Sequence, residues 1–485
     1  MSGCRRASDA GRQIQIFTPG QYIVHMTETV AVDEGALPTR GRVVAWAFWD
    51  WGSAAFNAVV TTFVFSTYLA SGLFVDPAIR EAAGDNAKDP ALVRALAENA
   101  ATISWALALA GIVVAIAAPV IGQRSDGSGR RKFWLGVNSF LVVACMLGMF
   151  FVQPFPSYLW LGAALLAAGN VFFEFAAVNN NAMLVQVSTP RTVGRVSGFG
   201  WGMGYMGGIV LLIILLAGFL FNFGDDAVRG LLGLPTGEAG ASLDVRLAIV
   251  VAAVWFGIFS LPLLVKVPEI PRQLDTERVG FLASYRRLWH TITALWRNNP
   301  NVLRFLLASA VFRDGLAAIF TFGAIIAAQV FGFTFTEVLL FGIAANVVAG
   351  VGTFIGGWVD DRFGAKVVII FSLVCLVGGG SAVLFVGDAK IGFWIVGLFL
   401  CLFVGPIQSS GRSFLARITP AGREGEIFGL YATTGRAVSF LAPTLFGVAV
   451  AIAGDTRWGI VGIMLVLLLG LILLIPVKTM HGQID

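Results

Sequence analysis

Charged residues are scarce in this sequence: Asp, Glu, Lys and Arg make up 13% of its 485 residues, against about a quarter in soluble proteins. There are only three histidines, all outside the long apolar runs, and only four cysteines. None of the cysteines has the spacing of a metal site or of a disulfide framework. We therefore expect no metal, and we interpret Cys145, Cys375 and Cys401, which lie in apolar runs, as small core residues.

Several signatures of catalysis are missing as well. The sequence has no HExxH pair for zinc, no nucleophile elbow and no phosphate-binding loop of the GxxxxGK[ST] kind. These absences argue against an enzyme, and we expect no cofactor and no nucleic-acid partner. Without a nucleotide site, transport powered by this chain's own nucleotide hydrolysis is also disfavoured.

Apolar residues dominate instead, at 57% of the chain and a mean hydropathy of +0.82. Apolar runs of roughly 20 residues, enough to cross a bilayer as a helix, recur along the chain. They predict an all-α polytopic membrane protein with twelve transmembrane helices in two pseudo-symmetric six-helix bundles. The predicted spans are 43–72, 98–121, 133–152, 157–183, 196–222, 245–267, 301–325, 336–358, 367–386, 391–412, 427–453 and 458–477.

The basic residues predict the orientation. Most of the 33 Lys and Arg residues lie in the tails and in the loops that follow even-numbered spans, which places these parts in the cytoplasm. The predicted division is a cytoplasmic tail 1–42, a bundle 43–267, a cytoplasmic connector 268–300, a bundle 301–477 and a cytoplasmic tail 478–485. The tail 1–42 has no signal-peptide core, and Met26 is an alternative start.

The connector carries apolar and basic residues at helical spacing, among them Trp289 and Arg286. It predicts an amphipathic helix that lies either on the membrane surface or against the cytoplasmic face of the bundle.

A charged loop of fixed pattern occurs twice. Gly122, Asp126, Gly129 and Arg131 in GQRSDGSGRRK match Gly357, Asp361, Gly364 and Lys366 in GWVDDRFGAK, although Ala365 stands where a basic residue is expected. Thr189-Pro190 with Gly194 and Gly198 is similarly repeated by Thr419-Pro420 with Gly425 and Gly429, at nearly the same offset. Two unrelated landmarks with one offset indicate an internal repeat of the two halves.

Small residues recur at four-residue spacing in the predicted spans 2, 5, 8 and 11, and three sets serve as examples. The sets are Gly200/Gly204/Gly208, Ala345/Ala349/Thr353 and Gly429/Thr433/Ala437. Because such stripes let helix backbones approach closely, we expect them to lie where the two halves meet.

With twelve spans and this loop after spans 2 and 8, the chain resembles the major facilitator superfamily. Four stretches are similar to one branch, the "unknown major facilitator" family related to fungal vacuolar amino-acid effluxers linked to autophagy. They are Trp46–Phe65, Gly194–Gly208, Phe312–Gly315 and Gly422–Pro443. The resemblance implies alternating access around a central cavity that spans 1, 4, 7 and 10 surround.

Six charged side chains of the predicted spans are candidates for the membrane interior: Asp50, Glu174, Arg313, Asp314, Arg412 and Arg436. Placing a charged side chain in the middle of the membrane costs about 2.5–3.5 kcal/mol of insertion free energy, so each of them requires either an ion-pair partner or a function that offsets this cost. Helical spacing places Ser53, Asn57 and Thr61 on the same helix face as Asp50. By the same spacing Asn170 shares a face with Glu174, and Gln408 shares one with Arg412.

We expect these residues to line the substrate and proton site. Asp50 and Glu174 would bind a coupling proton or an ammonium group, while an arginine holds a carboxylate. The alternative is a set of fixed ion pairs that only orient helices. For Asp314 we favour a structural or gating pair with Arg313, and Arg412 could simply extend to the interface. Trp46 fits the aromatic belt at the cytoplasmic interface.

The repeat and the resemblance together imply a role for the loops. Asp126 is expected at the amino end of span 11, near Gly425, and Asp361 near Gly194, because free helix N–H groups stabilise a carboxylate. The two loops would then form a cytoplasmic gate that is closed when the transporter faces outward. Its residues are Gly122, Asp126, Gly129, Arg130, Arg131, Gly357, Asp361, Arg362, Gly364 and Lys366. The alternative is that Asp126 only neutralises Arg130 and Arg131.

The sequence thus predicts a monomeric secondary transporter of a small polar or zwitterionic solute, an amino acid by resemblance, linked to protons and embedded in the lipid bilayer of a plasma or inner membrane. Two alternatives remain at this point: a lipid or amphiphile transporter of the same fold, and a receptor or structural protein that transports nothing.

Overall fold

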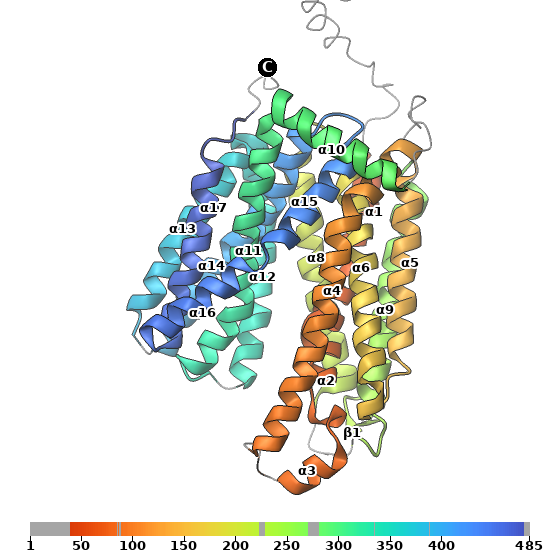
Figure 1. Cartoon of the computed structure of the whole chain (residues 1–485), viewed down its shortest axis with the longest axis vertical. Coiled ribbons are helices and arrows are strands. Elements are labelled where there is room, and N and C mark those ends of the chain that lie inside the picture. The colour runs from red at the N-terminus through yellow and green to blue at the C-terminus, as the bar shows by residue number, and fades with distance from the viewer. Residues whose placement is uncertain are drawn as a thin grey trace, which may run out of the picture. The chain divides into compact units, whose positions relative to one another are not determined.

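The computed structural model describes residues 39–84, 86, 89–222, 228–269, 281–333, 335–387 and 389–479 (Figure 1). Nearly all of the predicted tails and the first part of the connector lie outside these residues.

The described part of the first half contains thirteen α-helices or shorter helical segments in the order of a six-span bundle. They are α1 (Arg40–Ala54), η3 (Ala55–Phe63), α2 (Phe65–Leu69), η4 (Gly72–Phe74), α3 (Pro77–Ala83), α4 (Pro90–Ser128), α5 (Arg131–Met149), η5 (Pro156–Tyr158), α6 (Leu159–Ala182), α7 (Leu184–Val187), α8 (Val193–Leu215), η6 (Leu216–Leu220) and α9 (Leu243–Lys266). A short antiparallel pair, β1 (Val228–Arg229) with β2 (Leu234–Pro235), precedes α9.

The connector contributes α10 (Phe281–Asn298), which leads into the second half. That half comprises α11 (Pro300–Gln329), α12 (Phe335–Phe363), α13 (Ala365–Phe385), α14 (Lys390–Ile418), α15 (Glu424–Val438), α16 (Leu441–Ala453), η7 (Thr456–Trp458) and α17 (Gly459–Leu474).

Eleven helices of the described chain are long and apolar enough to cross a membrane. The first predicted span is not among them; it is divided into α1, η3 and α2 and carries the polar residues Asp50 and Asn57. With that span the chain has the predicted twelve, six in each half.

The first span departs from the regular helix that its spacing predicted. It changes from an α-helix to a π-helix at Ala55, in which hydrogen bonds join residues five apart. The α-helical spacing that placed Asp50, Ser53, Asn57 and Thr61 on one face therefore ends at Ala54. Ser53 is buried and donates to the carbonyl of Asp50, whereas Asn57 is exposed.

The predicted span 427–453 is also divided, into α15 and α16. The Asp314 carboxylate accepts a 2.6 Å hydrogen bond from the N–H of Ala442, at the start of α16. It therefore caps the second helix, since a carboxylate at a helix amino end satisfies free N–H groups. The predicted Asp314–Arg313 pair is thus not what the structure shows.

The two halves contact each other through α4 with α15 and through α8 with α12, and Figure 1 shows the halves converging toward the α10 end. Glycines allow this approach. A Cβ on Gly122 would lie 1.9 Å from the carbonyl oxygen of Gly425, and one on Gly198 would lie 2.9 Å from the Cα of Gly357. Gly429 similarly abuts Ala118.

Only one of the three small-residue stripes lies between the halves. Gly429 and Thr433 on α15 contact α4, as expected. The stripe that contains Gly200 and Gly204 instead faces mainly Asp50 on α1, in the same half, and reaches the other half only where a Cβ on Gly200 would lie 2.8 Å from the Arg412 guanidinium. The stripe of α12 likewise packs against a helix of its own half, since a Cβ on Gly405 of α14 would collide with Thr353. Small residues thus mark close helix contacts without showing which helix is the partner.

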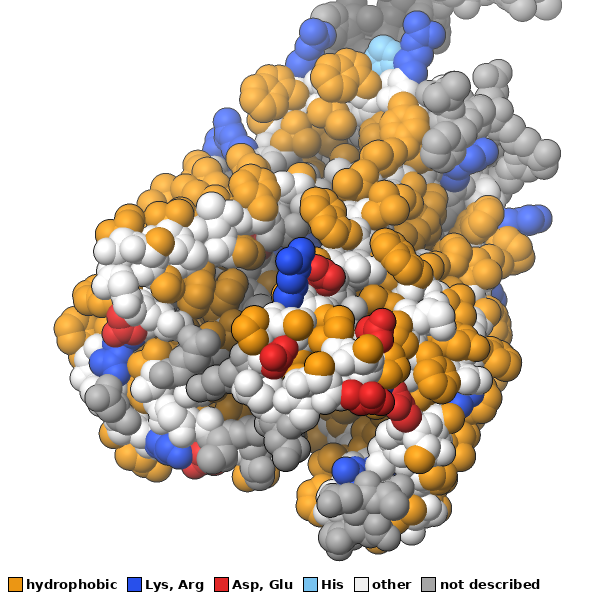
Figure 2. Space-filling model, turned by 60° about the horizontal axis from the view of Figure 1, so that its bottom comes forward, with side chains coloured by type: hydrophobic (Ala, Val, Ile, Leu, Met, Phe, Trp, Pro, Cys, Tyr) orange, Lys and Arg blue, Asp and Glu red, His pale blue; other side chains and the backbone are white. Residues whose placement is uncertain are grey.

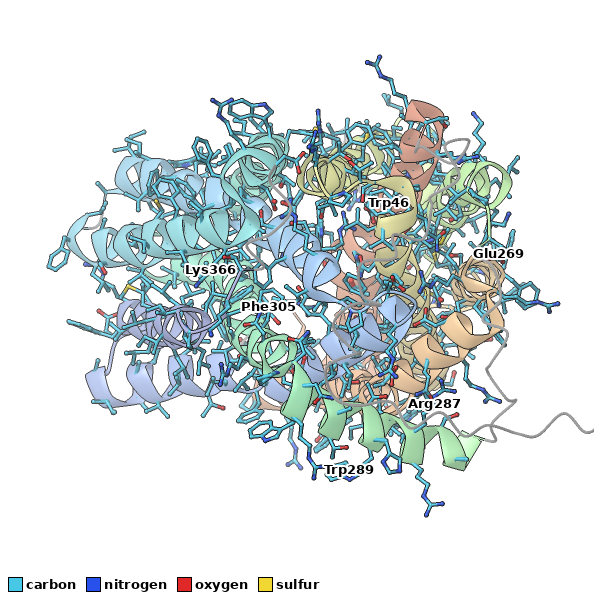
Figure 3. The ribbon with its side chains drawn as sticks, turned by 90° about the horizontal axis from the view of Figure 1, so that it is seen from above. Trp46, Glu269, Arg287, Trp289, Phe305 and Lys366 are labelled. Atoms are coloured by element: carbon cyan, nitrogen blue, oxygen red, sulfur yellow. The ribbon has the colours of Figure 1, made fainter. Side chains whose placement is uncertain are left out.

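Helix α10 packs through one face. Leu288, Thr291 and Leu295 are buried on that face, whereas Trp289 is 67% exposed. Figure 3, which looks onto the α10 end, shows Trp289 pointing outward from the helix and Trp46 lying among the other helices. The connector helix therefore contacts the rest of the chain on one side and presents aromatic and basic side chains on the other.

Candidate functional site

The Asp126 carboxylate is buried at the start of α15, where the sequence placed it. It accepts 3.0 Å hydrogen bonds from the N–H groups of Gly425 and Glu426. The Arg131 guanidinium lies 2.6 Å from Asp126 and 2.5 Å from Glu424. One basic residue thus joins an acid of the first half to an acid of the second.

The second copy of the loop repeats this arrangement on the other side of the interface. Asp361 accepts hydrogen bonds from the N–H groups of Gly194 (2.7 Å) and Arg195 (3.1 Å), at the start of α8. Arg417 contacts it at 3.4 Å and the neighbouring Asp360 at 2.5 Å. Both carboxylates therefore cap a helix of the opposite half.

The remaining residues of the two loops end helices or form contacts within their own half. Gly129 and Gly364 have φ values of +66° and +91° and end their helices, because glycine adopts this conformation without steric cost. Lys366 donates to the carbonyls of Ile475 and Val477, in its own half. The Arg362 guanidinium lies near the ring of Trp358 on its own helix. Arg130 is exposed.

A second set of contacts joins Asp50 of α1 to Arg412 of α14. Their side chains lie 3.2 Å apart, and Arg412 is 3% exposed. Arg412 also contacts the Asn181 side chain (3.2 Å) and both oxygens of Ser197 (2.7 and 3.0 Å), while Asn180 donates to Asp50 at 3.1 Å. This guanidinium from the second half is thus surrounded by polar groups of the first.

These contacts correct two expectations. Arg412 does not extend to the interface but is buried between the halves, because Asp50 supplies the opposite charge there. Trp46 is not part of an interfacial belt, because it is fully buried and its indole N–H donates to the carbonyl of Asn180. The guanidinium carbon of Arg412 lies 4.8 Å from the centre of the Trp46 ring. A tryptophan against a desolvated cation stabilises that cation.

Glu174 of α6 and Arg436 of α15 form another ion pair between the halves. Arg436 also contacts the Asn170 side chain at 3.3 Å. The predicted face that joins Asn170 to Glu174 is therefore present, and it faces α15. Both charged side chains are partly exposed, at 25% and 33%, so that water or a solute has access to them.

Arg313 of α11 differs from the other two basic residues. Its guanidinium lies 3.9 Å from the ring of Tyr431 and donates to that residue's carbonyl, but it forms no ion pair with any described carboxylate. It is close to the Arg436 turn, since a Cβ on Gly435 would lie 3.3 Å from its Nη1. Arg313 thus packs against the turn of α15 that carries Arg436. We call Arg313 and the Glu174–Arg436 pair, two positive charges and one negative, the Arg313–Glu174–Arg436 cluster.

The remaining predicted residues lie at the edges of these clusters. Gln408 accepts a 3.0 Å hydrogen bond from the Tyr205 hydroxyl, which also joins the halves. Thr61 donates to the carbonyl of Asn57 in its own helix. Sequence analysis missed Ser197, Asn180 and Tyr205; the run of three asparagines at 179–181 in an apolar helix was a signal for one of them.

The clusters lie at different depths. At 1.5 Å rise per residue, Arg412 lies roughly 9 Å from the end of α14 nearest α10, and Arg313 roughly 20 Å from the corresponding end of α11. Figure 2, with the opposite end forward, shows a notch between two lobes and a basic side chain beside an acidic one in the middle of the view. Within the described residues, no group of three or more His, Cys, Asp or Glu could hold a metal ion.

Comparison of the sequence with known protein families shows which family the chain belongs to. The family described as "Vacuole effluxer Atg22 like" matches residues 38–485. The chain belongs to this Atg22-like family. It is 25% identical over 443 residues to an uncharacterised MFS-type transporter, YxiO, of Bacillus subtilis, which covers 90% of this chain and 95% of YxiO. It is 26% identical to autophagy-related protein 22-1 of Aspergillus fumigatus, over 60% of this chain and about half (49%) of that protein.

Solved structures show the same fold. The proton:xylose symporter XylE aligns with a TM-score of 0.66 at 12% identity, over 89% of this chain and 94% of XylE. The transporter FucP in its outward conformation aligns with a TM-score of 0.63 at 14% identity, over 91% of this chain and 100% of FucP. This Atg22-like protein is therefore an integral multi-pass membrane protein and a secondary transporter of the major facilitator superfamily, not an enzyme.

Proposed function

We propose that this transporter moves a small zwitterionic solute, an amino acid by its family, in exchange with or alongside protons. Residues of both halves would hold the solute at the Arg313–Glu174–Arg436 cluster, in a monomer that works by alternating access. The excess of basic residues on the α10 side supports a cytoplasmic location for that side, in a plasma or inner membrane.

The observation that carries the substrate class is the unpaired guanidinium of Arg313. An intramembrane cation is costly unless it has a partner, and the described residues offer only a ring and a carbonyl. A solute carboxylate would complete the site, because guanidinium binds carboxylates in a bidentate way. The net positive charge of the cluster favours an anionic group for the same reason.

Glu174 supplies the complementary half of a zwitterion site. Its carboxylate is paired with Arg436, across the two halves, and both remain partly exposed. A solute ammonium that binds Glu174 would compete with Arg436 and would weaken this contact between halves. Binding would thereby be linked to movement of one half relative to the other.

Asp50 and Arg412 form a separate layer closer to the α10 side, which fits a proton-linked lock. A proton on Asp50 would remove the charge that holds Arg412 and would free the first half from α14. Asn57, which is exposed on the same span, would line the path of water toward this layer. The gate itself would be the two capped helices at Asp126 and Asp361.

The decisive experiment is uptake of a panel of amino acids into proteoliposomes under an imposed pH gradient, with wild type and Asp50→Asn. We expect wild type to accumulate at least one amino acid, and the variant to exchange it without responding to the gradient. Gradient-driven uptake by Asp50→Asn at the wild-type rate would refute the role of Asp50. If no amino acid moves in wild type, the substrate class is wrong although the fold stands.

Arg313→Gln is expected to raise the KM for the carboxylate-bearing solute roughly 30-fold, because a hydrogen bond to a charged group is lost, worth about 2 kcal/mol. The amide derivative of the same solute, which has no carboxylate charge, should be affected much less. Arg304→Gln is the matched control, since Arg304 lies exposed on the same helix. Equal KM values for wild type and Arg313→Gln would place the carboxylate elsewhere.

Asp126→Ala is expected to open the α10 side, because two N–H groups of α15 lose their acceptor at a cost of about 2 kcal/mol. A cysteine at Ser409, which is 1% exposed, would report the opening by its reaction with a maleimide in a background without native cysteines. Asp76→Ala is the control, because Asp76 caps α3 within one half. An unchanged labelling rate in Asp126→Ala would show that the loop is no gate.

A further inference from the structure

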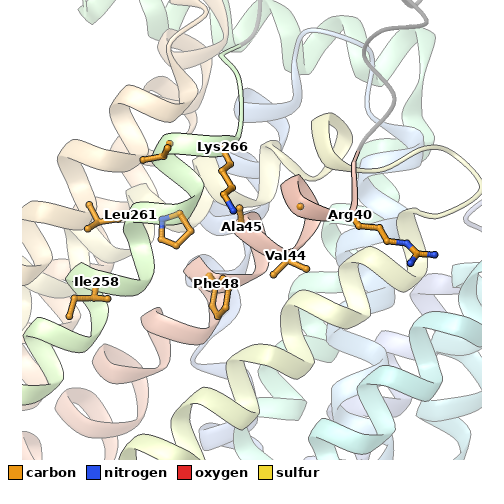
Figure 4. A pocket seen from close by; sticks show the side chains of 10 residues that line it. Arg40, Val44, Ala45, Phe48, Ile258, Leu261 and Lys266 are labelled. Atoms are coloured by element: carbon orange, nitrogen blue, oxygen red, sulfur yellow. The ribbon is translucent and has the colours of Figure 1, made fainter.

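A groove between α1 and α9 is not used by the proposed transport site. It has a volume of about 550 Å³ and is lined by Arg40, Gly41, Val44, Ala45, Phe48, Ile258, Leu261, Pro262, Val265 and Lys266 (Figure 4). The rings of Phe48 and Phe259 stack at its deeper end, 5.5 Å apart. The groove is thus apolar along its length, with two basic side chains at one end.

The apolar wall of the groove lies on the surface of membrane-spanning helices. Val44, Ile258, Leu261 and Val265 are 39%, 55%, 46% and 77% exposed. In a chain that crosses a membrane, such side chains contact hydrocarbon rather than water. The occupant of the groove must therefore present a long apolar segment, which a soluble anion does not have.

The basic end lies where lipid headgroups are found. Arg40 begins α1 and Lys266 ends α9, so both occupy the same end of adjacent spans and both line the groove. In Figure 4 the Lys266 side chain points toward Ala45, whereas the Arg40 side chain extends away from it. Neither forms an ion pair within the described part of the chain. The acid nearest in sequence, Glu269, accepts instead from the N–H groups of Lys132 and Phe133.

The backbone at this end adds donors. The first turn of α1 contains no acidic residue, and the side chain of its N-cap residue, Thr39, forms no capping hydrogen bond. Nothing among the described atoms lies within 4 Å of the position of a Cβ on Gly41, so that an anion can approach the free N–H groups there closely. Two exposed basic side chains at the end of an apolar groove and these donors provide the groups that bind a phosphate.

We propose that the α1–α9 groove binds one anionic phospholipid of the leaflet on the α10 side. Its phosphate contacts Arg40, Lys266 and the first turn of α1, and one acyl chain lies along Val44, Phe48 and Leu261. The charge pattern selects an anionic headgroup such as phosphatidylglycerol over zwitterionic phosphatidylcholine.

Native mass spectrometry of the purified full-length protein, titrated with dioleoyl-phosphatidylglycerol or dioleoyl-phosphatidylcholine, tests this proposal. We expect one phosphatidylglycerol to be retained in preference to phosphatidylcholine. Arg40→Ala/Lys266→Ala should weaken that binding roughly 30-fold, since each basic residue at the surface contributes about fivefold. Arg286→Ala/Arg297→Ala is the matched control, with two exposed cations removed from α10 on the same side.

Two further variants separate binding from misfolding. The exchange Arg40→Lys/Lys266→Arg keeps both charges and should retain the lipid, whereas Leu261→Trp fills the groove and should lose it with both cations in place. The proposal is overturned if the double alanine variant binds phosphatidylglycerol like wild type or if Leu261→Trp has no effect. Displacement of the lipid by excess inorganic phosphate would also overturn it, because the site would then recognise a soluble anion.

Discussion

Arg412→Ala is expected to destabilise the conformation seen here by about 3–5 kcal/mol, the cost of leaving a buried charge without its partner. Asp50 would remain with only the amide of Asn180 as a donor, and Ser197 would lose the guanidinium that it contacts on two sides. Thermal unfolding of the purified protein and labelling of a cysteine at Ser409 measure the two consequences. We expect a lower Tm, faster labelling and no gradient-driven transport.

The double variant Asp50→Asn/Arg412→Gln provides the control. It replaces two opposite charges by two amides of similar shape that can still form hydrogen bonds, so that stability should return close to the wild-type value. Coupling to the pH gradient should not return, because no titratable group remains in this layer. A wild-type Tm for the single variant Arg412→Ala would show that the pair contributes nothing to this conformation.

Gly122→Ala is expected to have a comparably large effect on the same equilibrium, through steric overlap rather than charge. The added Cβ would lie 1.9 Å from the carbonyl oxygen of Gly425 and 2.4 Å from its carbonyl carbon. Because backbone atoms cannot move aside as a flexible side chain can, α4 and α15 must separate, at a cost of about 3 kcal/mol. The α10 side should open, and labelling of a cysteine at Ser409 should rise strongly.

Gly323→Ala serves as the matched substitution. Gly323 lies inside α11, and nothing lies within 4 Å of an added Cβ, so that alanine should be neutral or slightly stabilising there. Gly198→Ala offers an independent test at the other contact, where the Cβ would lie 2.7 Å from the carbonyl of Thr353. Slow labelling in Gly122→Ala, like that of wild type, would mean that this close approach does not hold the halves together.

Much of the arrangement at the α10 end could be predicted because it repeats. Asp126 at Gly425 and Asp361 at Gly194 follow from two loops and two helix starts at nearly one offset, since an internal repeat requires symmetric partners. The asymmetric details were not predictable. In the first copy, Arg131 joins Asp126 to Glu424. In the second copy, Asp361 pairs with Arg417 instead, and Lys366, the equivalent of Arg131, donates to carbonyls of its own half.

The ion pairs inside the membrane show the limit of the sequence more sharply. Six charges in apolar spans could be found because each is costly there, but their pairing could not. Arg412, for which extension to the interface was one alternative, is paired with Asp50. Asp314 was expected to pair with Arg313 and instead caps α16. The partners lie far apart in the chain, so that local spacing contains no information on which faces meet.

By itself, the sequence determined that this chain crosses a membrane twelve times in two repeated halves. The length of each apolar run and the charges that flank it can be read from consecutive residues, and the bilayer requires spans of that length and favours basic loops on one side. Only the tertiary structure decided that Arg313 has no carboxylate partner among the described residues, while Arg412 and Arg436 have theirs. It also decided that α1 becomes a π-helix beyond Asp50. Both features depend on how helices pack against one another, and packing is settled by the fit of whole surfaces rather than by residues within one turn.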